Sequence, residues 1–314
     1  MPIPFRYTGP LKPENKYGHQ PAAEGDGINA ATGNYTYSNA DLTVPGRGIP
    51  LTINRSYNSL DTSAVSPFGY GWNFNYSTTV FTDVYGNPTV LSGDGRRDQF
   101  TRQDTSIGVT YVPYAGVSAK LEYNVDGTWK LTQMDRNVLN FDSQGRLTSQ
   151  ADANGNTTTL TYDEWGRVSR VTDAPGRAIV FTYNANGYIE SITTDIPGFD
   201  PWTVSYSYNG DDLTGFTEPD GHSWTYHYYD NTHRIREIID PRGNPYVTLT
   251  YNAEGKVQTQ LDAEGRDVAL VYYTGKTDIT DNDNQKTKYF DDQFNLIRQE
   301  DTDGVTEFGY TATG

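Results

Sequence analysis

The stretch TTTLTYDEWGRVSRVTDAPG, residues 157–176, decides the fold of this chain. Within it, Leu160 and Tyr162 alternate with threonines, which is the period of two expected of a strand with one buried face. Gly166 then supplies the positive φ of a tight turn, and the chain runs back to a second turn at 173–176. This stretch therefore predicts a β-hairpin.

The hairpin unit recurs along most of the chain. Each copy is marked by an aromatic residue followed by Asp or Asn, at steps of about 21 to 25 residues, and an acidic turn ending in Gly follows most copies. The marker pairs are Phe141-Asp142, Tyr162-Asp163, Tyr183-Asn184, Tyr208-Asn209, Tyr229-Asp230 and Tyr251-Asn252, with a weaker copy at Phe290-Asp291. Two turns per copy predict two strands per copy, and such units are stabilised by contacts with their neighbours.

The returning strand of the unit departs from strict alternation. Val168 and Val171 lie three residues apart, as do Ile235 and Ile238, and this spacing predicts a bulge or a strong twist. No window of a dozen residues keeps a helical period without an intervening Gly, Pro or Asn-Gly. The fold class predicted is therefore all-β, built from antiparallel hairpins.

The composition limits the classes of function. The 314 residues include 40 acidic and 24 basic side chains, a net charge of -16, which disfavours binding to nucleic acids or to anionic membrane surfaces. The 35% hydrophobic content leans toward disorder, but 13% aromatic residues favour a folded chain. The absence of cysteine excludes disulfides, thiolate nucleophiles and Cys-type metal sites. No run approaches the ~20 apolar residues of a membrane span.

The first part of the chain differs from the repeats. Residues 1–27 hold five prolines and no hydrophobic period, which predicts an extended leader. The start lacks the basic and apolar regions of a signal peptide, so we expect export by another route or a piece of a longer protein. Further on, alternation predicts a strand with one buried face, whose inward residues are Leu51, Ile53, Arg55 and Tyr57.

Two sets of motifs resemble those of one family. The pattern Tyr162-Asp163-x-x-Gly166-Arg167-Val168, followed by Asp173-x-x-Gly176, resembles the YD repeat of Rhs proteins, of wall-associated toxins of that class and, more distantly, of teneurins. This resemblance covers about residues 120–310, with an insertion at 192–202 and a departure at 277–288. Other motifs look like the small domain of unknown function before the repeats of bacterial Rhs proteins: Ala31-Thr32-Gly33-Asn34, Asp41-Leu42, residues 45–51, Arg55-Ser56-Tyr57-Asn58-Ser59 and Gly69-Tyr70-Gly71-Trp72.

The resemblance implies a domain organisation and a function. It implies a leader (1–27), an Rhs-associated β domain (28–115) and a YD-repeat array (116–314) that spirals into part of a hollow β-shell. A shell one sheet thick would have walls wetted on both faces, which the Tyr and Thr content would suit. The implied role is a non-catalytic module of a secreted or cell-surface toxin, whose partners are a C-terminal effector or further repeats of the same polypeptide.

Family members release the toxin with a DPxG-type motif. Asp240-Pro241-Arg242-Gly243 matches only the short turn inside the array, so autoproteolysis is not expected here.

No residue is predicted to be catalytic, to bind a cofactor or to bind a metal. The histidines are His19, His222, His227 and His233, and an odd spacing on one strand would point His222 and His227 to opposite faces. Residues 281–284 (Asp-Asn-Asp-Asn) lack the Gly and Glu of a calcium loop, and residues 124–129 lack the spacing and further copies of a sialidase Asp-box; both predict plain turns.

Two alternatives of other classes remain open. One is a glycan-binding adhesion module that would use Trp202, Trp224, Tyr226 and Tyr228 as stacking platforms, although we predict that these aromatics fill the hairpin interface. The other is a polysaccharide hydrolase that would use a pair of carboxylates, although many of the acids lie in turns where Asp caps its own backbone.

Overall fold

The computed structural model describes residues 23–46, 48–61, 65–106, 108–114 and 116–309. Within these ranges the protein is almost wholly β, as predicted, with a single 3-10 turn of three residues. No helix in this part of the chain has the length and apolar character needed to cross a membrane. His19 and most of the predicted leader lie outside the described residues.

The first part of the structure consists of short sheets. Its elements are β1 (Ala23–Glu24), β2 (Ile28–Asn29), β3 (Asn34–Val44), β4 (Leu51–Asn58), β5 (Val65–Ser66), β6 (Gly69–Tyr70), β7 (Trp72–Phe74), η2 (Asn75–Ser77), β8 (Thr79–Thr82), β9 (Pro88–Leu91), β10 (Arg97–Thr105) and β11 (Gly108–Pro113). They form a five-stranded sheet in the order β1-β2-β3-β4-β7, called the inner sheet below, a four-stranded sheet β11-β10-β9-β8 and a two-stranded sheet β5-β6.

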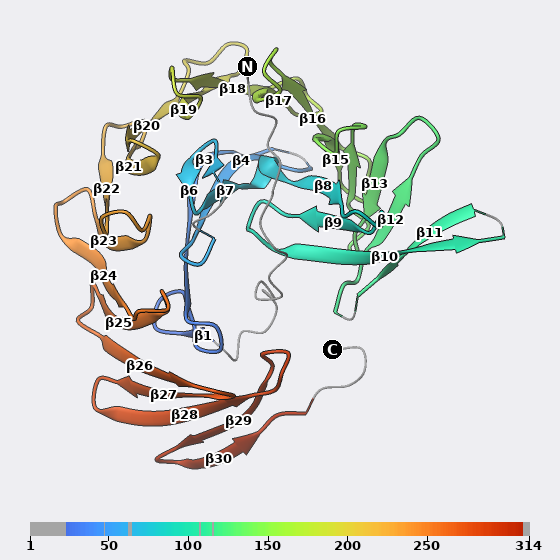
Figure 1. The fold of residues 1–314 in the computed structure, drawn as a ribbon. Helices are drawn as coiled ribbons and strands as arrows, with labels where there is room; N and C mark the ends of the chain where they lie inside the picture. Colours follow the sequence, from blue (N-terminus) through green and yellow to red (C-terminus); the bar gives the residue numbers. More distant parts are fainter. Residues whose placement is uncertain (1–22, 47, 62–64, 107, 115, 310–314) are drawn as a thin grey trace.

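The rest of the chain forms one sheet of 19 strands in sequence order, called the wall below. Its strands are β12 (Lys120–Tyr123), β13 (Trp129–Thr132), β14 (Val138–Phe141), β15 (Leu147–Ala151), β16 (Thr157–Tyr162), β17 (Val168–Thr172), β18 (Ala178–Tyr183), β19 (Ile189–Asp195), β20 (Thr203–Asn209), β21 (Asp212–Thr217), β22 (Ser223–Tyr228), β23 (Ile235–Ile239), β24 (Pro245–Tyr251), β25 (Val257–Asp262), β26 (Asp267–Tyr273), β27 (Lys276–Asp281), β28 (Asn284–Phe290), β29 (Leu296–Asp301) and β30 (Gly304–Glu307). The wall curves around the inner sheet (Figure 1).

The repeat motif builds its turn through the Asp side chain. Asp163 Oδ1 accepts hydrogen bonds from the backbone N–H groups of Trp165 and Arg167, at 3.0 and 2.8 Å. Gly166 has φ of +77° and donates its N–H to the carbonyl of Asp163. The acidic residue therefore satisfies the backbone donors of the turn, which explains why an acid or Asn follows the marker aromatic at residues 142, 163, 184, 252 and 291.

The predicted bulge is present in the returning strands. In β17, Val168 pairs with Tyr162 and Arg170 pairs with Thr161, so Ser169 has no opposite residue. Val168 and Val171 consequently both point inward and are 7% and 0% exposed. The same skip occurs in β15, β19, β21, β23, β25 and β29. Because a bulge bends and twists its strand, its repetition favours a curved strip over a flat one.

The inner face of the wall is dry where it meets the inner sheet, so the expectation of a wall wetted on both faces is wrong here. One continuous hydrophobic core joins the two parts. Its wall members include Ile192, Val204, Leu213, Phe216, Tyr226 and Ile238, each at most 1% exposed, and its inner-sheet members include Leu51, Ile53 and Trp72. The face is buried because another sheet covers it, which the strand periodicity could not reveal.

Two local features refine the expectations. Ala23–Glu24 pairs with Ile28–Asn29, so the last residues of the predicted leader form a hairpin of the inner sheet. The departure at 277–288 consists of two hairpins, β26–β27 and β27–β28, that pair without a register shift. Asn282, in the turn between β27 and β28, has φ of +48°, so the chain turns at 281–284 as predicted.

Candidate functional site

Most marker tyrosines link their hairpin to the one before it. The Tyr162 hydroxyl donates to the carbonyl of Leu147, and the Tyr183 hydroxyl donates to the carbonyl of Val168, at 2.5 and 2.7 Å. The accepting residue stands beside the bulge of the preceding unit. The marker tyrosines Tyr208 and Tyr251 make the same bond, to Ile189 and Ile235. Two tyrosines that are not markers, Tyr228 and Tyr272, make it to Leu213 and Val257. The marker Tyr229 instead donates to the carbonyl of Leu249 in the next unit. Each tyrosine thereby satisfies a carbonyl of the neighbouring unit.

The basic residue of the motif makes a second link between the same two units. Arg167 donates to Asp163 of its own turn at 2.8 Å, and its guanidinium lies 4.1 Å from the ring centre of Tyr183 in the next unit. Arg146 makes the equivalent contact with Tyr162, at 4.6 Å. One side chain therefore combines an ion pair within its turn with a cation–π contact to the following repeat, which holds the units in register.

A buried ion pair joins the inner sheet to the wall. The side chains of Arg55 on β4 and Asp41 on β3 are both 0% exposed, and the Arg55 Nε donates to Asp41 at 2.8 Å. The wall completes the network, because Tyr206 donates to Asp41 and Arg55 donates to Tyr226, at 2.8 and 2.9 Å. The guanidinium also lies 4.3 Å from the ring centre of Trp72. Burial alone would lower the pKa of Arg55, and the charge of Asp41 raises it above its ordinary value instead.

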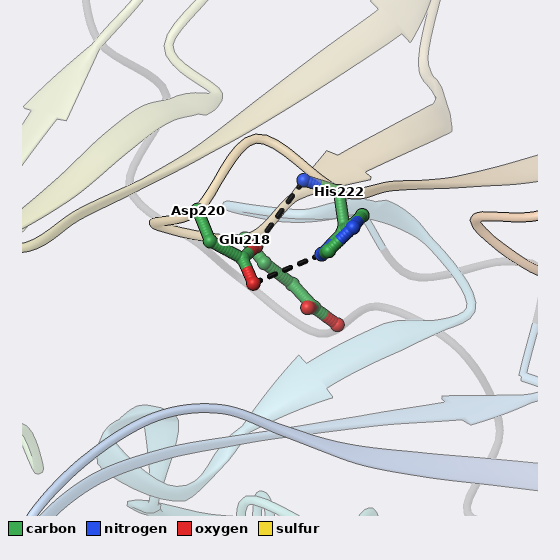
Figure 2. Close-up of side chains that lie close together, drawn as sticks. All are labelled: Glu218, Asp220 and His222. Carbon is green, nitrogen blue, oxygen red and sulfur yellow. Dashed lines mark hydrogen bonds and ion pairs between the residues drawn. The ribbon is translucent and has the colours of Figure 1, made fainter.

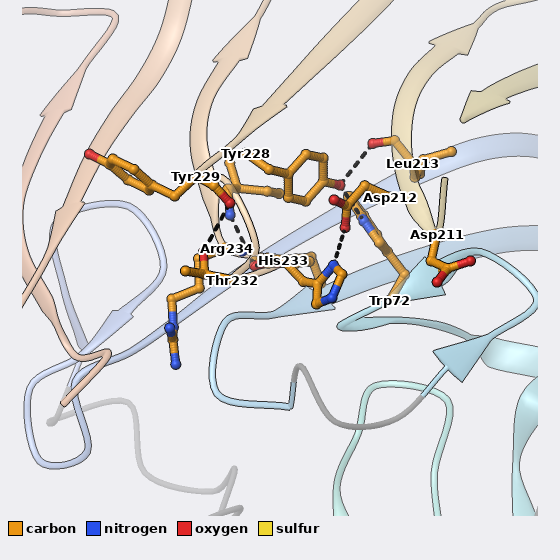
Figure 3. A network of polar contacts seen from close by, with 12 residues as sticks. Trp72, Asp211, Asp212, Leu213, Tyr228, Tyr229, Thr232, His233 and Arg234 are labelled. Atoms are coloured by element: carbon orange, nitrogen blue, oxygen red, sulfur yellow. Dashed lines mark hydrogen bonds and ion pairs between the residues drawn. The ribbon is translucent and has the colours of Figure 1, made fainter. Parts of the chain in front are cut away.

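A second network lies beside this ion pair (Figure 3). The Trp72 Nε1 donates to the Tyr228 hydroxyl at 2.9 Å, and the Tyr57 hydroxyl donates to the carbonyl of His233 at 2.8 Å. His233 has φ of +56°, its Nδ1 lies 2.8 Å from Asp212, and its ring stacks on Tyr70. The ring and the carbonyl of His233 thus both anchor the turn before β23 to the inner part of the structure.

The turns that follow the marker aromatics also contact the first part of the structure through their backbones. The bonds run from Val80 N–H to Gly145 O, Ile189 N–H to Pro67 O, Tyr70 N–H to Asp211 O and Val257 N–H to Gly33 O, at 2.8 to 3.1 Å. A Cβ atom on Gly145 would lie 1.9 Å from the Val80 carbonyl oxygen, so this contact requires glycine. One edge of the wall is therefore fixed to the inner elements along much of its length.

An open cleft of about 550 Å³ lies between β3 and the wall. Its lining comprises Asn39, Ala40, Asp41, Trp202, Phe216, Glu218, Pro219 and Asp220. At its rim, ligand-type atoms of Glu218, Asp220 and His222 lie within 4.8 Å of one another (Figure 2). Asp220 pairs with His222 at 2.9 Å, and Glu218 accepts a hydrogen bond from Trp224, so each already has a protein partner. The grouping alone does not indicate a metal.

The structure places the remaining predicted residues individually. His222 lies in the turn before β22 and not on a strand, which corrects the prediction, while His227 lies on β22 and pairs with Glu237 at 3.1 Å. Tyr226 is fully buried and Trp224 and Tyr228 are partly buried against the core, as predicted, whereas Trp202 is 55% exposed at the cleft. An exposed stacking platform along β22 is therefore absent.

The acidic candidates form ordinary turn contacts. Asp281 pairs with Arg266 and Lys286, and Arg266 lowers the pKa of this carboxyl. Asp240 accepts from the N–H groups of Arg242 and Asn244, both at 2.8 Å, as in the other hairpin turns. A hydrolase acid needs a raised pKa, but bonding to the His222 backbone lowers that of Asp220.

Comparisons with known proteins support the sequence interpretation. A family model described as "Domain of unknown function (DUF6531)" matches residues 25–100, and one described as "RHS Repeat" matches residues 141–178 and 206–245. The tRNA3(Ser)-specific nuclease WapA of Bacillus spizizenii is 33% identical over 131 residues, and the tRNA nuclease WapA of Bacillus subtilis is 32% identical over 131 residues. These matches cover 42% of the chain, and the chain spans 5% of the length of each relative.

Solved structures also resemble the fold at low sequence identity. The crystal structure of TcdB2-TccC3-TEV matches 88% of this chain and 19% of its own chain, at 14% identity and a TM-score of 0.45. The crystal structure of TcdB2-TccC3 matches 73% of this chain and 14% of its own, at 14% identity and a TM-score of 0.43.

Proposed function

This chain is an Rhs/YD-repeat protein, and from that premise we propose that it is a non-catalytic wall segment of a larger β-shell that encloses a C-terminal effector. The observation that carries the proposal is that hydrogen bonds join successive units of the wall to one another and join several of these units to the first part of the structure. Tyrosine and arginine links join the units, and the Arg55–Asp41 pair joins the wall to its lining. Side chains used in this way supply rigidity and curvature.

The ends of the wall support a role within a longer assembly. Among the described residues, β12 pairs only with β13, and β30 pairs only with β29. Each end strand thus offers a row of backbone donors and acceptors on which further repeats of the same polypeptide could add. We propose such repeats, or the effector, as the partners of this chain, and a secreted or cell-surface location for the complete protein.

The proposed domain organisation keeps the boundaries inferred from the sequence. The wall starts at Lys120, within the proposed repeat array of residues 116–314. The inner sheet starts at Ala23, slightly before the proposed Rhs-associated domain of residues 28–115. Because one core joins the two parts, we propose that they fold as a unit and that the first lines the second.

Limited proteolysis of the natural polypeptide that contains this chain tests the enclosure. If the segment after the wall is enclosed, it should be cut no earlier than the wall strands themselves. The same segment produced without this chain should be cut rapidly. Cutting of that segment while β12–β30 remain intact, or the absence of any segment there, would refute enclosure.

The cleft at Trp202 favours a second candidate, the glycan-binding module. Trp202 is held in place by backbone and side-chain bonds to Thr194 and offers an exposed ring beside the polar groups of Asn39 and Glu218. Such a ring can stack on a sugar. Binding to a glycan panel that is lost in Trp202→Ala, and retained in the matched exposed variant Trp165→Ala, would favour this function, and no binding would remove it.

A further inference from the structure

The four-stranded sheet ends in a hairpin whose outer strand has a free edge. Among the described residues, β11 pairs only with β10, and Figure 1 shows this hairpin extending away from the curve of the wall. Val109 and Val112 of β11 are 44% and 41% exposed, and the strand carries no charged side chain. The end strands of the wall differ, because β12 holds Lys120 and Glu122 and β30 holds Glu307. Charges of that kind protect a strand edge from pairing, and β11 lacks this protection.

The register of the hairpin shows which backbone groups face outward. Tyr114 donates its N–H to the carbonyl of Gln99, which the register places opposite it, at 2.9 Å. Residues of an antiparallel pair point their backbone groups alternately toward and away from the partner strand. Val109, Tyr111 and Pro113 therefore direct these groups away from β10. Because proline has no N–H, the outer edge of β11 offers two donors, on Val109 and Tyr111, and three acceptors.

We propose that β11 is a dimerisation edge, which pairs antiparallel with β11 of a second copy of this chain about a twofold axis at Thr110. In this register Val109 of each copy lies opposite Tyr111 of the other, and each such pair exchanges two backbone hydrogen bonds. The two equivalent pairs use both outward donors of each copy, while Pro113, which has no donor, lies beyond them. Two four-stranded sheets thereby join into one. This inference goes beyond the shell role, because β11 does not belong to the wall.

Charge and geometry favour a second copy as the occupant of this edge. The charged residues of the outer half of the hairpin, Arg102 and Asp104, pair with each other at 2.8 Å and cancel. Antiparallel pairing near the hairpin tip places the rest of each copy at opposite ends of the joint sheet, so the two net charges of -16 stay apart. At roughly 0.15 M salt, charges are screened within about 8 Å, which leaves little repulsion between them. Each pair of Val109 with Tyr111 also joins a β-branched side chain to an aromatic one, a combination that stabilises sheets.

Sedimentation velocity of the full chain tests the dimer, at roughly 0.15 M salt and up to about 300 µM, since a small interface gives a weak complex. The unaltered chain should show a reversible monomer–dimer equilibrium. Val109→Pro should weaken dimerisation at least about tenfold, because it removes one outward donor from each copy and leaves the bonds to β10 intact. Val305→Pro is the matched control. It removes an outward donor from the edge of β30, where Phe308 donates to Ile297 of β29, and this variant should still dimerise.

A charge swap at Thr110 tests the register and the identity of the partner. The side chain of Thr110 is exposed, and in the proposed dimer it lies opposite its own copy. Thr110→Lys alone and Thr110→Glu alone should each dimerise several-fold more weakly, because like charges directly opposite each other destabilise a strand pair. An equimolar mixture of the two variants should dimerise at least as tightly as the unaltered chain. Neither substitution removes a backbone donor, so this experiment decides the proposal if Val109→Pro does not fold.

Three results would overturn the proposal. The first is an unaltered chain that stays monomeric over the whole concentration range, which would leave the edge of β11 to an extended segment of another protein. The second is a Val109→Pro variant that dimerises as tightly as the unaltered chain; loss of the dimer in Val305→Pro would then place the interface at β30. The third is a mixture of the two Thr110 variants that dimerises no more tightly than either variant alone.

Discussion

Removal of the Arg55 guanidinium should be among the most damaging single changes in this protein. Arg55→Leu leaves the Asp41 carboxylate 0% exposed, and its remaining donors among the described residues are the hydroxyl of Tyr206 and the amide of Asn39. Removing one partner of a buried pair costs about 3–5 kcal/mol. Loss of the stacking on Trp72, at 4.3 Å, adds about 1 kcal/mol. We therefore expect a loss of about 4 to 6 kcal/mol in the free energy of unfolding.

Urea unfolding followed by tryptophan fluorescence measures this loss, because Trp72 lies against the guanidinium. The double variant Arg55→Leu/Asp41→Leu should recover at least about 2 kcal/mol of it, since no buried charge is then left unpaired. As a control, Arg102→Leu breaks an exposed pair with Asp104 and should leave the midpoint unchanged. A loss below about 1 kcal/mol for Arg55→Leu, or a double variant no more stable than the single one, would refute the reasoning.

Four further outcomes are expected. Gly166→Val and Gly187→Val should each lower the free energy of unfolding by about 1 kcal/mol or more, because both glycines have positive φ. Gly145→Val should lower it further, because its Cβ would meet the Val80 carbonyl oxygen. Unchanged denaturation midpoints would contradict the turn assignment. Burial raises the pKa of Tyr246 to about 12 and also raises the pKa values of other buried tyrosines, such as Tyr35 and Tyr228. The unfolded chain therefore ionises first, and stability should fall as pH rises above about 10; a flat stability curve there, measured by urea unfolding, would be the contrary result. Circular dichroism should show helix below about 10%, and a pair of helical minima would contradict the fold. The exposed edge of β30 should promote association as the salt concentration rises, because salt screens the repulsion from the net charge of -16 within about 8 Å at roughly 0.15 M. Light scattering that shows a salt-independent oligomer, or a chain that never associates, would count against an exposed edge.

The sequence alone determined the local architecture. The pattern of period two with regular turn residues is visible within each unit, because a strand and its turn depend on neighbours only a few residues away. The three-residue spacing of Val168 and Val171 likewise predicted the bulge, which the pairing of β16 and β17 confirms. The turn at 281–284 was foreseeable for the same reason.

Only the tertiary structure decided what fills the inner face of the wall and which groups meet there. The alternation of β4 placed Arg55 on a buried face, but Tyr226, which accepts its hydrogen bond, and Tyr206, whose ring it faces, lie more than 150 residues along the chain. The cleft at Trp202 and the Glu24 contacts with β28 likewise depend on how far the wall curves. That curvature is the sum of small twists at many bulges and of packing against the inner sheet, and no short stretch of sequence encodes such a sum.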